Sequence, residues 1–430
     1  TLNGTGSVNL VGTTPDGGSG GIYANSSQLG NSSNVTINTT DFNQLDAAYI
    51  VIGTYGPAAG GNLTINASGD VTMAGVGALN DPVQTWTGSR GTGPSGEILV
   101  NAANMYVRDG AQLGSYAPGP SDAGDITLLI DGLLEVSGQA QDDFGRPYQT
   151  MIDPSGRDGN GGNTIVRAED VRLLDGGIIV GTSFGTGNAG SIDIEATTFE
   201  TGGTTSDLFT EFGDPLVWTS GIWSINEQFE GGNGGDISVR ADTITIGRGS
   251  AIHAFSSGGV SGDVTLTANE SFIMGGAGEL NEYGFIIDAS IDTESRFGVL
   301  REGVGGSIRI TAPVIDIRAD SYIGSVAQFA PGTGGNIEIV ASESLSISAD
   351  GADFGTVINS EGAFSATPGN ILLSAPDIVI SGADILSDTS FSSASAGSIT
   401  ILAENSIVLD NETRLAAISY YGGRGGDVRL

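Results

Sequence analysis

The chain has 430 residues and a formal net charge of −35, because 50 Asp and Glu residues oppose 15 cationic residues, all of them Arg. A charge of this sign and size argues against nucleic-acid binding and against docking on anionic lipid, which both need a cationic surface. With no Cys and one His, the sequence excludes disulfides, thiolate nucleophiles and Cys-rich or poly-His metal sites. No apolar run reaches the roughly 18 residues of a membrane span.

One short unit recurs along the chain: Gly, a small polar residue, and then apolar-x-apolar-x-Ala. Clear copies occupy residues 61–67, 190–196 and 235–241. Fourteen such anchors are separated by 27, 28, 35, 28, 38, 28, 45, 27, 44, 29, 34, 28 and 29 residues. In chain order the anchors are Gly6, Ser33, Gly61, Gly96, Gly124, Gly162, Gly190, Gly235, Gly262, Gly306, Gly335, Gly369, Gly397 and Gly426.

Each anchor is followed by two more alternating runs, for example residues 244–246 and 251–254 after Gly235. Three short strands per unit cannot bury their apolar faces alone, but stacked units can. No helical apolar period is sustained. The sequence therefore predicts an all-β parallel β-helix solenoid of about 14 coils of 27–29 residues, forming a single segment over 1–430. We expect the closing Ala at a crowded corner and the anchor Gly in a tight turn or at positive φ.

The longer spacings fall in every second coil, so the sequence predicts insertions in alternate coils. We expect them after the third strand, near residues 80–95, 141–160, 205–233, 278–304 and 361–368, on one edge of the solenoid. These segments hold much of the aromatic content. Their aromatic side chains are candidates for binding a partner or a glycan, or alternatively fold back and seal the solenoid's side. The candidates are Trp86, Phe144, Tyr148, Trp218, Trp223, Tyr283 and Phe285.

The repeat resembles that of filamentous-haemagglutinin-like exoproteins of the two-partner secretion family, with cyanobacterial-type Gly-rich turns. Residues 397–409, Gly-Ser-Ile-Thr-Ile-Leu-Ala-Glu-Asn-Ser-Ile-Val-Leu, carry the likeness most closely. The resemblance covers nearly the whole chain, although each motif is short. It implies a right-handed coil, export through an outer-membrane transporter, and adhesion, aggregation or surface fibres. It also implies that this chain is an internal segment of a longer, secreted polypeptide.

Parallel β-helices also carry polysaccharide hydrolases and lyases, so carboxylate pairs need attention. Asp142-Asp143 is the one adjacent acidic pair of that kind, but the Gly-His-Gly and Lys-containing motifs of pectin hydrolases are missing, and His253 lies in Ile-His-Ala. A solvated loop is the default interpretation. Asp153, Asp158 and Asn160 offer oxygen ligands in one Gly-rich segment, where a calcium site competes with ordinary Asx turns. The sequence predicts no catalytic residue, cofactor or metal ligand.

The sequence therefore predicts a secreted, cell-surface structural or adhesive β-helix, an acidic rod or fibre whose partners are copies of itself or surface glycans. The alternative is a carbohydrate-active β-helix enzyme, a polysaccharide hydrolase or lyase. A groove lined by three or more carboxylates would favour the enzyme, whereas a smooth acidic face with aromatic side chains at the loop tips would favour the adhesin.

Overall fold

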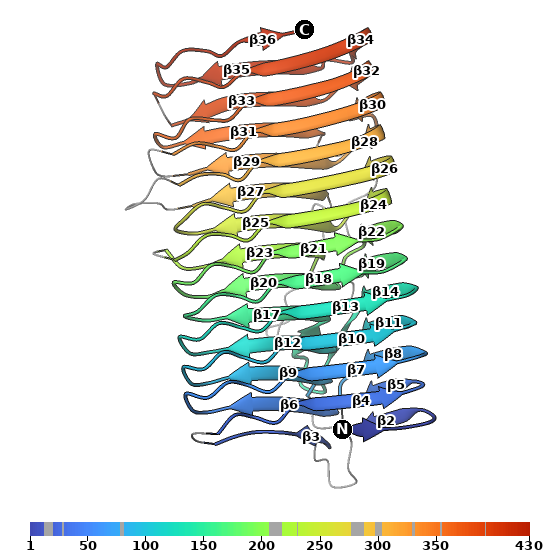
Figure 1. The fold of residues 1–430 in the computed structure, drawn as a ribbon. Helices are drawn as coiled ribbons and strands as arrows, with labels where there is room; N and C mark the ends of the chain where they lie inside the picture. The colour runs from blue at the N-terminus through green and yellow to red at the C-terminus, as the bar shows by residue number, and fades with distance from the viewer. Residues whose placement is uncertain are drawn as a thin grey trace. The chain divides into compact units, whose positions relative to one another are not determined.

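The computed structural model describes residues 1–12, 20–27, 30–77, 81–205, 217–229, 231–276, 288–296, 303–328, 332–352, 355–391 and 393–430. These residues form strands and turns, with no helix among them and so none suited to crossing a membrane. They group into two compact units. Unit 1 is Thr1–Thr197 with Thr201–Ile222, and unit 2 is Thr198–Glu200 with Trp223–Leu430. Parallel strands are stacked coil upon coil in each unit, which confirms the predicted parallel β-helix (Figure 1).

Each coil of unit 1 contributes one short strand to each of three parallel sheets, called here the first, second and third faces. The first face holds β1 (Leu2–Asn3), β4 (Val35–Thr39), β7 (Leu63–Ala67), β10 (Ile98–Ala102), β13 (Ile126–Ile130), β18 (Thr164–Arg167) and β21 (Ile192–Glu195). The second holds β2 (Val8–Val11), β5 (Phe42–Leu45), β8 (Asp70–Ala74), β11 (Asn104–Arg108), β14 (Leu133–Ser137) and β19 (Asp170–Leu174). The third holds β3 (Gly21–Tyr23), β6 (Tyr49–Thr54), β9 (Gln84–Ser89), β12 (Gln112–Ala117), β17 (Met151–Gly156) and β20 (Ile178–Ser183).

Two further pieces complete this part of the chain. A hairpin of β15 (Gln139–Gln141) and β16 (Pro147–Gln149) interrupts one coil of unit 1 and is antiparallel. Strands β22 (Thr198–Gly202) and β23 (Ser220–Asn226) have residues in both units.

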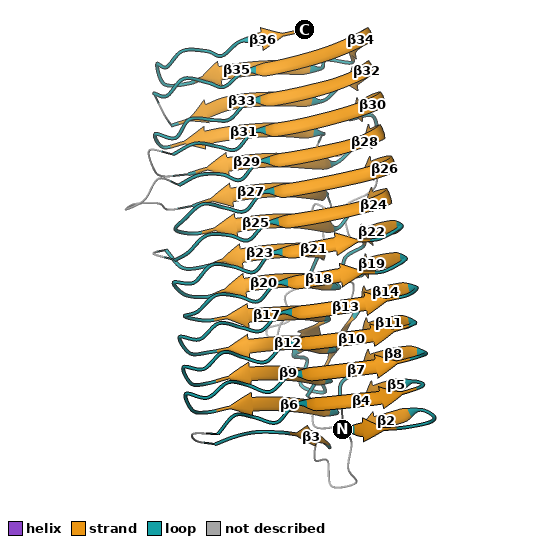
Figure 2. Ribbon diagram, in the orientation of Figure 1, coloured by secondary structure: helices purple, strands orange, loops and turns teal. Residues whose placement is uncertain are grey.

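In unit 2 the first and second strands of a coil merge into one long bent strand, as Figure 2 shows by the longer arrows. These strands are β24 (Ile237–Ile246), β26 (Val264–Met274), β28 (Ile308–Ile317), β30 (Ile337–Ser348), β32 (Ile371–Ser381) and β34 (Ile399–Asp410), followed by the short β36 (Val428–Arg429). The third face holds β25 (Ser250–Ser256), β27 (Ala289–Ser295), β29 (Ser321–Ala327), β31 (Val357–Ala363), β33 (Asp384–Ser390) and β35 (Arg414–Ser419).

Apolar columns form the core, because alternate residues of every strand point inward. On the first face of unit 1 the register aligns Ile37, Ile65, Val100 and Leu128, and all four side chains are fully buried. Burying one such side chain contributes about 1.5–3 kcal/mol relative to leaving it in water. The repeated columns therefore hold each coil to the next.

In several coils the Ala that closes the anchor lies at a crowded corner, as predicted. Ala241, Ala312 and Ala375 in unit 2 are buried. The strand pairing shifts register directly after each of them, where the long strand bends from the first face to the second. A larger side chain would have no room at such a bend.

The anchor glycines are needed for close contact between coils and not for positive φ. A Cβ on Gly96 would overlap the carbonyl oxygen of Gly61, and a Cβ on Gly124 would overlap that of Gly96. None of the anchor glycines is among the described glycines with positive φ. The predicted positive φ is therefore wrong for the described anchor glycines, and their requirement for glycine comes from the close approach of successive coils.

The anchor assigned to Gly6 is wrong, because the run that follows it belongs to the second face. Val8–Val11 pairs with Phe42–Leu45, whereas the first-face strand of this coil is Leu2–Asn3, paired with Ile37–Asn38. Short alternating runs on the two faces have the same period of two, so one run can be mistaken for the other. With the correct strand, the alternation of long and short coils starts at Leu2, 35 residues before its partner Ile37.

The predicted position of the insertions is wrong for most coils. Extra residues enter between the second and third strands, and only in the coil of β26 and β27 do several also follow the third strand, where 12 residues separate Ser295 from Ile308 against 7 between Ser256 and Val264 in the preceding coil. Strands β9, β17, β23, β27 and β31 lie inside or across the ranges predicted as loops. For example, the extra residues of one coil are 349–356, before β31, rather than 361–368. The spacing of anchors fixes the length of an insertion but not its place, and third strands rich in Ser, Thr and Gly give a weak alternating signal.

Candidate functional site

The predicted aromatic candidates lie on separate elements. Trp86 is on β9, Phe144 and Tyr148 are in the β15–β16 hairpin, Trp218 lies just before β23, and Trp223 is on β23. Tyr283 and Phe285 lie outside the described residues. Trp86 is the candidate that lines a pocket on the third face of unit 1.

Two neighbouring glycines form the floor of this pocket. Gly53 on β6 and Gly88 on β9 are aligned in register, and Tyr116 on β12 follows them in the same outward row. Because neither glycine has a side chain, the row is open above both strands. The space, called here the Gly53 pocket, has a volume of about 280 Å³.

Aromatic rings form the walls of the Gly53 pocket. Trp86 stands on one side, and its ring meets that of Tyr116 edge to face, with centroids 6.2 Å apart and planes at 67°. On the other side Tyr55 carries the guanidinium of Arg90 over its ring, 5.4 Å from the centroid. Asn25 reaches over the floor, since its Oδ1 lies 3.3 Å from where a Cβ of Gly53 would be. The pocket thus combines ring faces with a few polar groups, as ligand sites do.

A glycine also fixes the position of Trp86. A Cβ on Gly114, the next residue in its row, would overlap the six-membered ring of the indole. The ring therefore lies against bare backbone on this side, and its half-buried position is set by packing. Both roles predicted for such residues, sealing the coil and lining a binding surface, are compatible with this placement.

Two ionisable residues lie near the Gly53 pocket: Tyr49 lines it, and Asp153 belongs to the outward row that contains Trp86 and Gly114. Burial, and then the nearby carboxylate of Asp81, raise the pKa of Tyr49, so its phenol remains protonated. Beyond Gly114 in the same row stands Asp153. Burial raises the pKa of Asp153 to about 6, although a hydrogen bond from Ser155 opposes the shift. Asp153 is therefore a poor ligand for a hard cation at mildly acidic pH.

Asn160 in the neighbouring segment makes a contact between coils. Its side-chain oxygen accepts a hydrogen bond from the N–H of Asn188, 28 residues further on, at 2.8 Å, so this oxygen is not used in a local Asx turn. In the part of the chain that the structure describes, no group of three or more His, Asp or Glu is placed to hold a metal ion.

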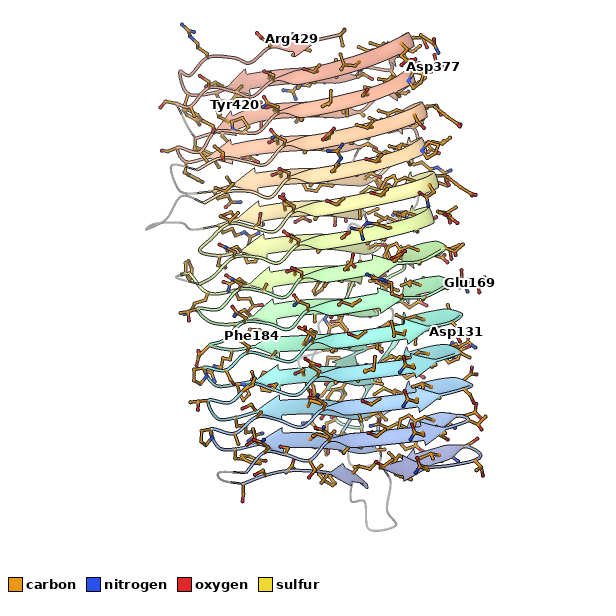
Figure 3. All side chains as sticks on the ribbon, viewed as in Figure 1. Asp131, Glu169, Phe184, Asp377, Tyr420 and Arg429 are labelled. Carbon is orange, nitrogen blue, oxygen red and sulfur yellow. The ribbon has the colours of Figure 1, made fainter. Side chains whose placement is uncertain are left out.

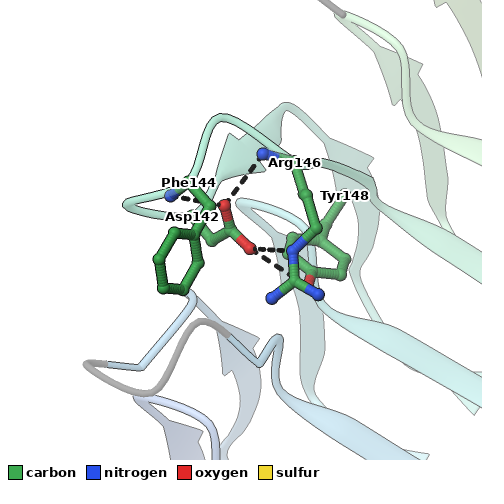
Figure 4. A network of polar contacts seen from close by, with 4 residues as sticks. All are labelled: Asp142, Phe144, Arg146 and Tyr148. Carbon is green, nitrogen blue, oxygen red and sulfur yellow. Dashed lines mark hydrogen bonds and ion pairs between the residues drawn. The ribbon is translucent and has the colours of Figure 1, made fainter. Parts of the chain in front are cut away.

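Asp142 caps the turn of the β15–β16 hairpin (Figure 4). Its Oδ1 accepts hydrogen bonds from the N–H groups of Phe144 and Arg146, both at 2.8 Å, and its Oδ2 pairs with Arg146 Nε at 2.5 Å. Burial opposes ionisation, but these donors outweigh it and hold the pKa of Asp142 below its usual range. A carboxylate so firmly ionised cannot serve as a general acid, and its contacts give Asp142 a structural role.

The remaining candidates differ in exposure. Phe144 is 73% exposed at the hairpin tip, with the Arg146 guanidinium 5.7 Å from its ring centroid. Trp218 closes a bridge through its backbone, donating to Thr205 Oγ1 and accepting from the Thr205 N–H. Trp223 is half-buried, and its indole Nε1 is buried with no hydrogen-bond partner among the described residues.

The third face of unit 2 carries a cluster that the sequence did not reveal, called here the acidic row: Asp292, Glu294, Glu361 and Asp388. Glu294, Val326, Glu361 and Asp388 are aligned across β27, β29, β31 and β33, and Asp292 lies two residues before Glu294. Arg296 Nε and Gln328 Nε2 both bind Glu294 Oε1 at 2.7 Å, and Ser390 donates to Glu361. Only the strand register brings these residues together, so the signal was hidden in the third strands.

His253 joins the acidic row through Asp292, with His253 Nδ1 3.1 Å from Asp292 Oδ1. Burial lowers the pKa of His253 to about 4, and burial together with Glu294 and Asp288 raises the pKa of Asp292 to about 8. Burial thus disfavours the charged form of both groups. Burial and then Glu361 raise the pKa of Asp388 to about 6. Three atoms here, His253 Nε2, Asn359 Oδ1 and Asp388 Oδ1, are buried without a hydrogen-bond partner among the described residues.

A second unpredicted feature is a stack of aromatic rings at the turns that follow the third strands of unit 2. Phe364 and Phe391 stack with centroids 5.2 Å apart and planes at 9°, and Tyr421 stacks on Phe391 at 5.6 Å. Phe391 is 61% and Tyr421 59% exposed. Phe364 and Phe391 have φ values of 50° and 54°, in the left-handed region that a bulky residue seldom adopts.

Comparisons of the chain with protein-family models, with curated proteins and with solved structures gave no match.

Proposed function

We propose that this chain is a structural and adhesive segment of a secreted, cell-surface exoprotein. In this proposal a stiff β-helix presents exposed aromatic side chains to glycans or to further copies of the same chain. The resemblance of the repeat to filamentous-haemagglutinin-like exoproteins supports export through an outer-membrane transporter. The observation that carries the proposal is that each unit presents aromatic side chains at its surface: Trp86 and Tyr116 line a pocket of unit 1, and the exposed rings of Phe391 and Tyr421 stack at the turns of unit 2.

Two features of the coils support stiffness. In unit 1 the outward amides of Asn3, Asn38, Asn66 and Asn101 form a ladder, with donor–acceptor distances of 2.7, 2.8 and 2.7 Å from coil to coil. The apolar columns repeat on the inside of the same strands. The asparagine ladder and the apolar columns together hold the coils rigid. Surface side chains on such coils are pre-organised, so they lose less conformational entropy on binding.

The surface is acidic and well solvated. Figure 3 shows Asp131 and Glu169 of unit 1 projecting at the turns between first-face and second-face strands. With a net charge of −35, such carboxylates keep an extended coil soluble and suppress non-specific association. On this acidic surface, we expect the exposed aromatic side chains to make the contacts with a binding partner.

The test is adhesion by the purified chain. Beads coated with the chain should bind to glycan-bearing cell surfaces or to one another, and free chain should compete. Adhesion no greater than that of beads coated with an unrelated acidic protein would overturn the proposal.

The acidic row favours a second candidate, a polysaccharide hydrolase or lyase. Glycosidases combine one protonated and one ionised carboxyl group about 5–9.5 Å apart. Asp292 and Glu294 project from the same side of one strand, where Cα atoms two residues apart are separated by about 6.6 Å. Against it, Glu294 is already bound by Arg296 and Gln328. Release of reducing ends from a panel of polysaccharides, lost in Asp292→Asn, would replace the adhesive proposal by this one.

A further inference from the structure

We propose that the Gly53 pocket of unit 1 binds a hexopyranose ring of a neutral polysaccharide, with Trp86 as its aromatic platform. This inference rests on the proposed adhesive function and names the ligand class of one contact point. It is carried by the shape of the pocket, the fixed position of the indole and the kinds of polar group around it.

The shape fits a small, flat ligand unit. Gly53 and Gly88 give two strands of bare backbone as the floor, and Trp86, Tyr116 and Tyr55 rise around it. A volume of about 280 Å³ lies at the lower end of the range for ligand sites, which is roughly 300–1,000 Å³. One or two sugar rings match this size, whereas a folded peptide element would not enter.

The platform is rigid before any ligand binds. Gly114 supports one side of the indole, and the ring of Tyr116 meets it edge to face at 6.2 Å. One face of a pyranose ring is lined with C–H groups, and such a face stacks on an aromatic ring. A ring already fixed by packing loses little rotamer freedom on binding.

The polar groups suit hydroxyl-rich ligands. The side chains of Asn25, Gln84, Tyr49 and Tyr55 border the pocket, and amides and phenols can both donate and accept hydrogen bonds. Gln84 is oriented by its own bond, since its Nε2 donates to Gln112 Oε1 at 3.0 Å. These groups can therefore pair with sugar hydroxyls that act as hydrogen-bond donors and with those that act as acceptors.

The charges favour a neutral sugar. The one cation that lines the pocket among the described residues, Arg90, lies over the ring of Tyr55. Asp81 stands beside Tyr49. The chain as a whole, with its net charge of −35, repels polyanions at low salt. The negative charge of the chain would therefore repel the carboxylates of a uronic-acid polymer, whereas it would not repel a neutral glycan.

The experiment is calorimetric titration of the purified chain with tetrasaccharides of glucose, mannose and galactose, beside a tetramer of galacturonic acid. Trp86→Ala removes the platform. Gly53→Val fills the floor, at a site where an added Cβ meets nothing closer than Asn25 Oδ1 at 3.3 Å. Phe184→Ala, an exposed aromatic residue of unit 1 outside the pocket, is the matched control (Figure 3). Circular dichroism confirms that each variant is folded.

We expect at least one neutral tetrasaccharide to bind, with affinity reduced tenfold or more in Trp86→Ala and Gly53→Val and unchanged in Phe184→Ala. Failure of every neutral tetrasaccharide to bind, equal affinity in Gly53→Val, or binding of the galacturonic tetramer alone would overturn the inference. The bead assay separates the two proposals. Adhesion by the unaltered chain together with failure of every neutral tetrasaccharide to bind overturns the pocket inference and leaves the adhesive function standing, whereas absence of adhesion by the unaltered chain overturns the function itself.

Discussion

The indole of Trp86 lies against Gly114, the residue that follows it in the outward row of the third face of unit 1, and a Cβ at Gly114 would overlap the indole ring. Strand β9 thus carries the aromatic wall of the pocket, and the next strand, β12, has a glycine at the position where a side chain would displace the indole. The pocket depends on both residues, which lie 28 positions apart.

This relationship predicts the effect of Gly114→Val. The added side chain displaces the indole, and overpacking of this kind costs about 1–3 kcal/mol of unfolding free energy. We expect a lower midpoint in urea unfolding and a shifted tryptophan emission maximum. Gly6→Ala is the control, because a Cβ there meets nothing within 4 Å. Equal stability of Gly114→Val and the unaltered chain would contradict the packing described for Trp86.

A buried serine joins consecutive anchors in unit 2. Ser360 Oγ donates to the carbonyl of Gly335 at 3.0 Å and accepts from the N–H of Gly369 at 2.8 Å. Ser360→Ala leaves both backbone groups unpaired, which costs about 1–3 kcal/mol. Equilibrium unfolding measures the loss. Ser342→Ala, at an exposed position of β30, should stay within about 0.5 kcal/mol of the unaltered chain.

The carboxylate of Asp142 organises the hairpin turn, so Asp142→Ala should loosen it locally. We expect amide hydrogen exchange to accelerate at least tenfold over residues 139–149 and to stay unchanged in the neighbouring strands. The pKa of Asp142 is lower in the folded chain than in the unfolded chain. Its contribution is therefore present above the ordinary value of 3.8 and is lost as the pH falls through the folded value. Unchanged amide hydrogen exchange over residues 139–149 in Asp142→Ala would contradict the capping role of Asp142.

Asp292 predicts a stability change of the opposite sign at higher pH. Its pKa is raised from 3.8 to about 8 on folding, so the folded chain binds more protons than the unfolded chain across this window. Unfolding free energy should therefore fall as the pH rises toward 8. His253, with its pKa lowered from 6.5 to about 4, acts in the other direction, but only below pH 6.5.

The clearest window for Asp292 is therefore pH 6.5 to 8, where thermal unfolding should show a falling midpoint. Asp292→Asn should flatten this slope, and Asp384→Asn, on the outer side of the same face, should keep it. A slope that persists in Asp292→Asn would show that another group is responsible.

Much of the fold was predictable from the sequence because its signal is repeated. The Gly-x-apolar-x-apolar-x-Ala unit marks the first strand of nearly every coil, and the buried corner of Ala241 repeats at Ala312 and Ala375. The third strands were harder to place, since inward Ser and Thr, such as Ser360, replace apolar residues there. Because the apolar alternation of the third strands is weak, the sequence-based prediction put most insertions after these strands and not before them.

The candidate sites show the same limit. Trp86 was identified by residue type, but its pocket arises from Gly53 and Gly88, which look like ordinary strand glycines until the register is known. The acidic row was missed for the same reason, because Glu294, Glu361 and Asp388 are far apart in sequence and meet only through stacking. Asp142 and Asp143 drew attention as a pair, whereas Asp142 proves to be a turn cap.

Electron microscopy of the native material, labelled with antibodies against this chain, examines the proposed surface role at the cell itself. We expect label on the outer cell surface, on rods or fibres whose coils rise by about 4.8 Å along the axis. Label confined to the cell interior, or a soluble protein without any surface association, would contradict it.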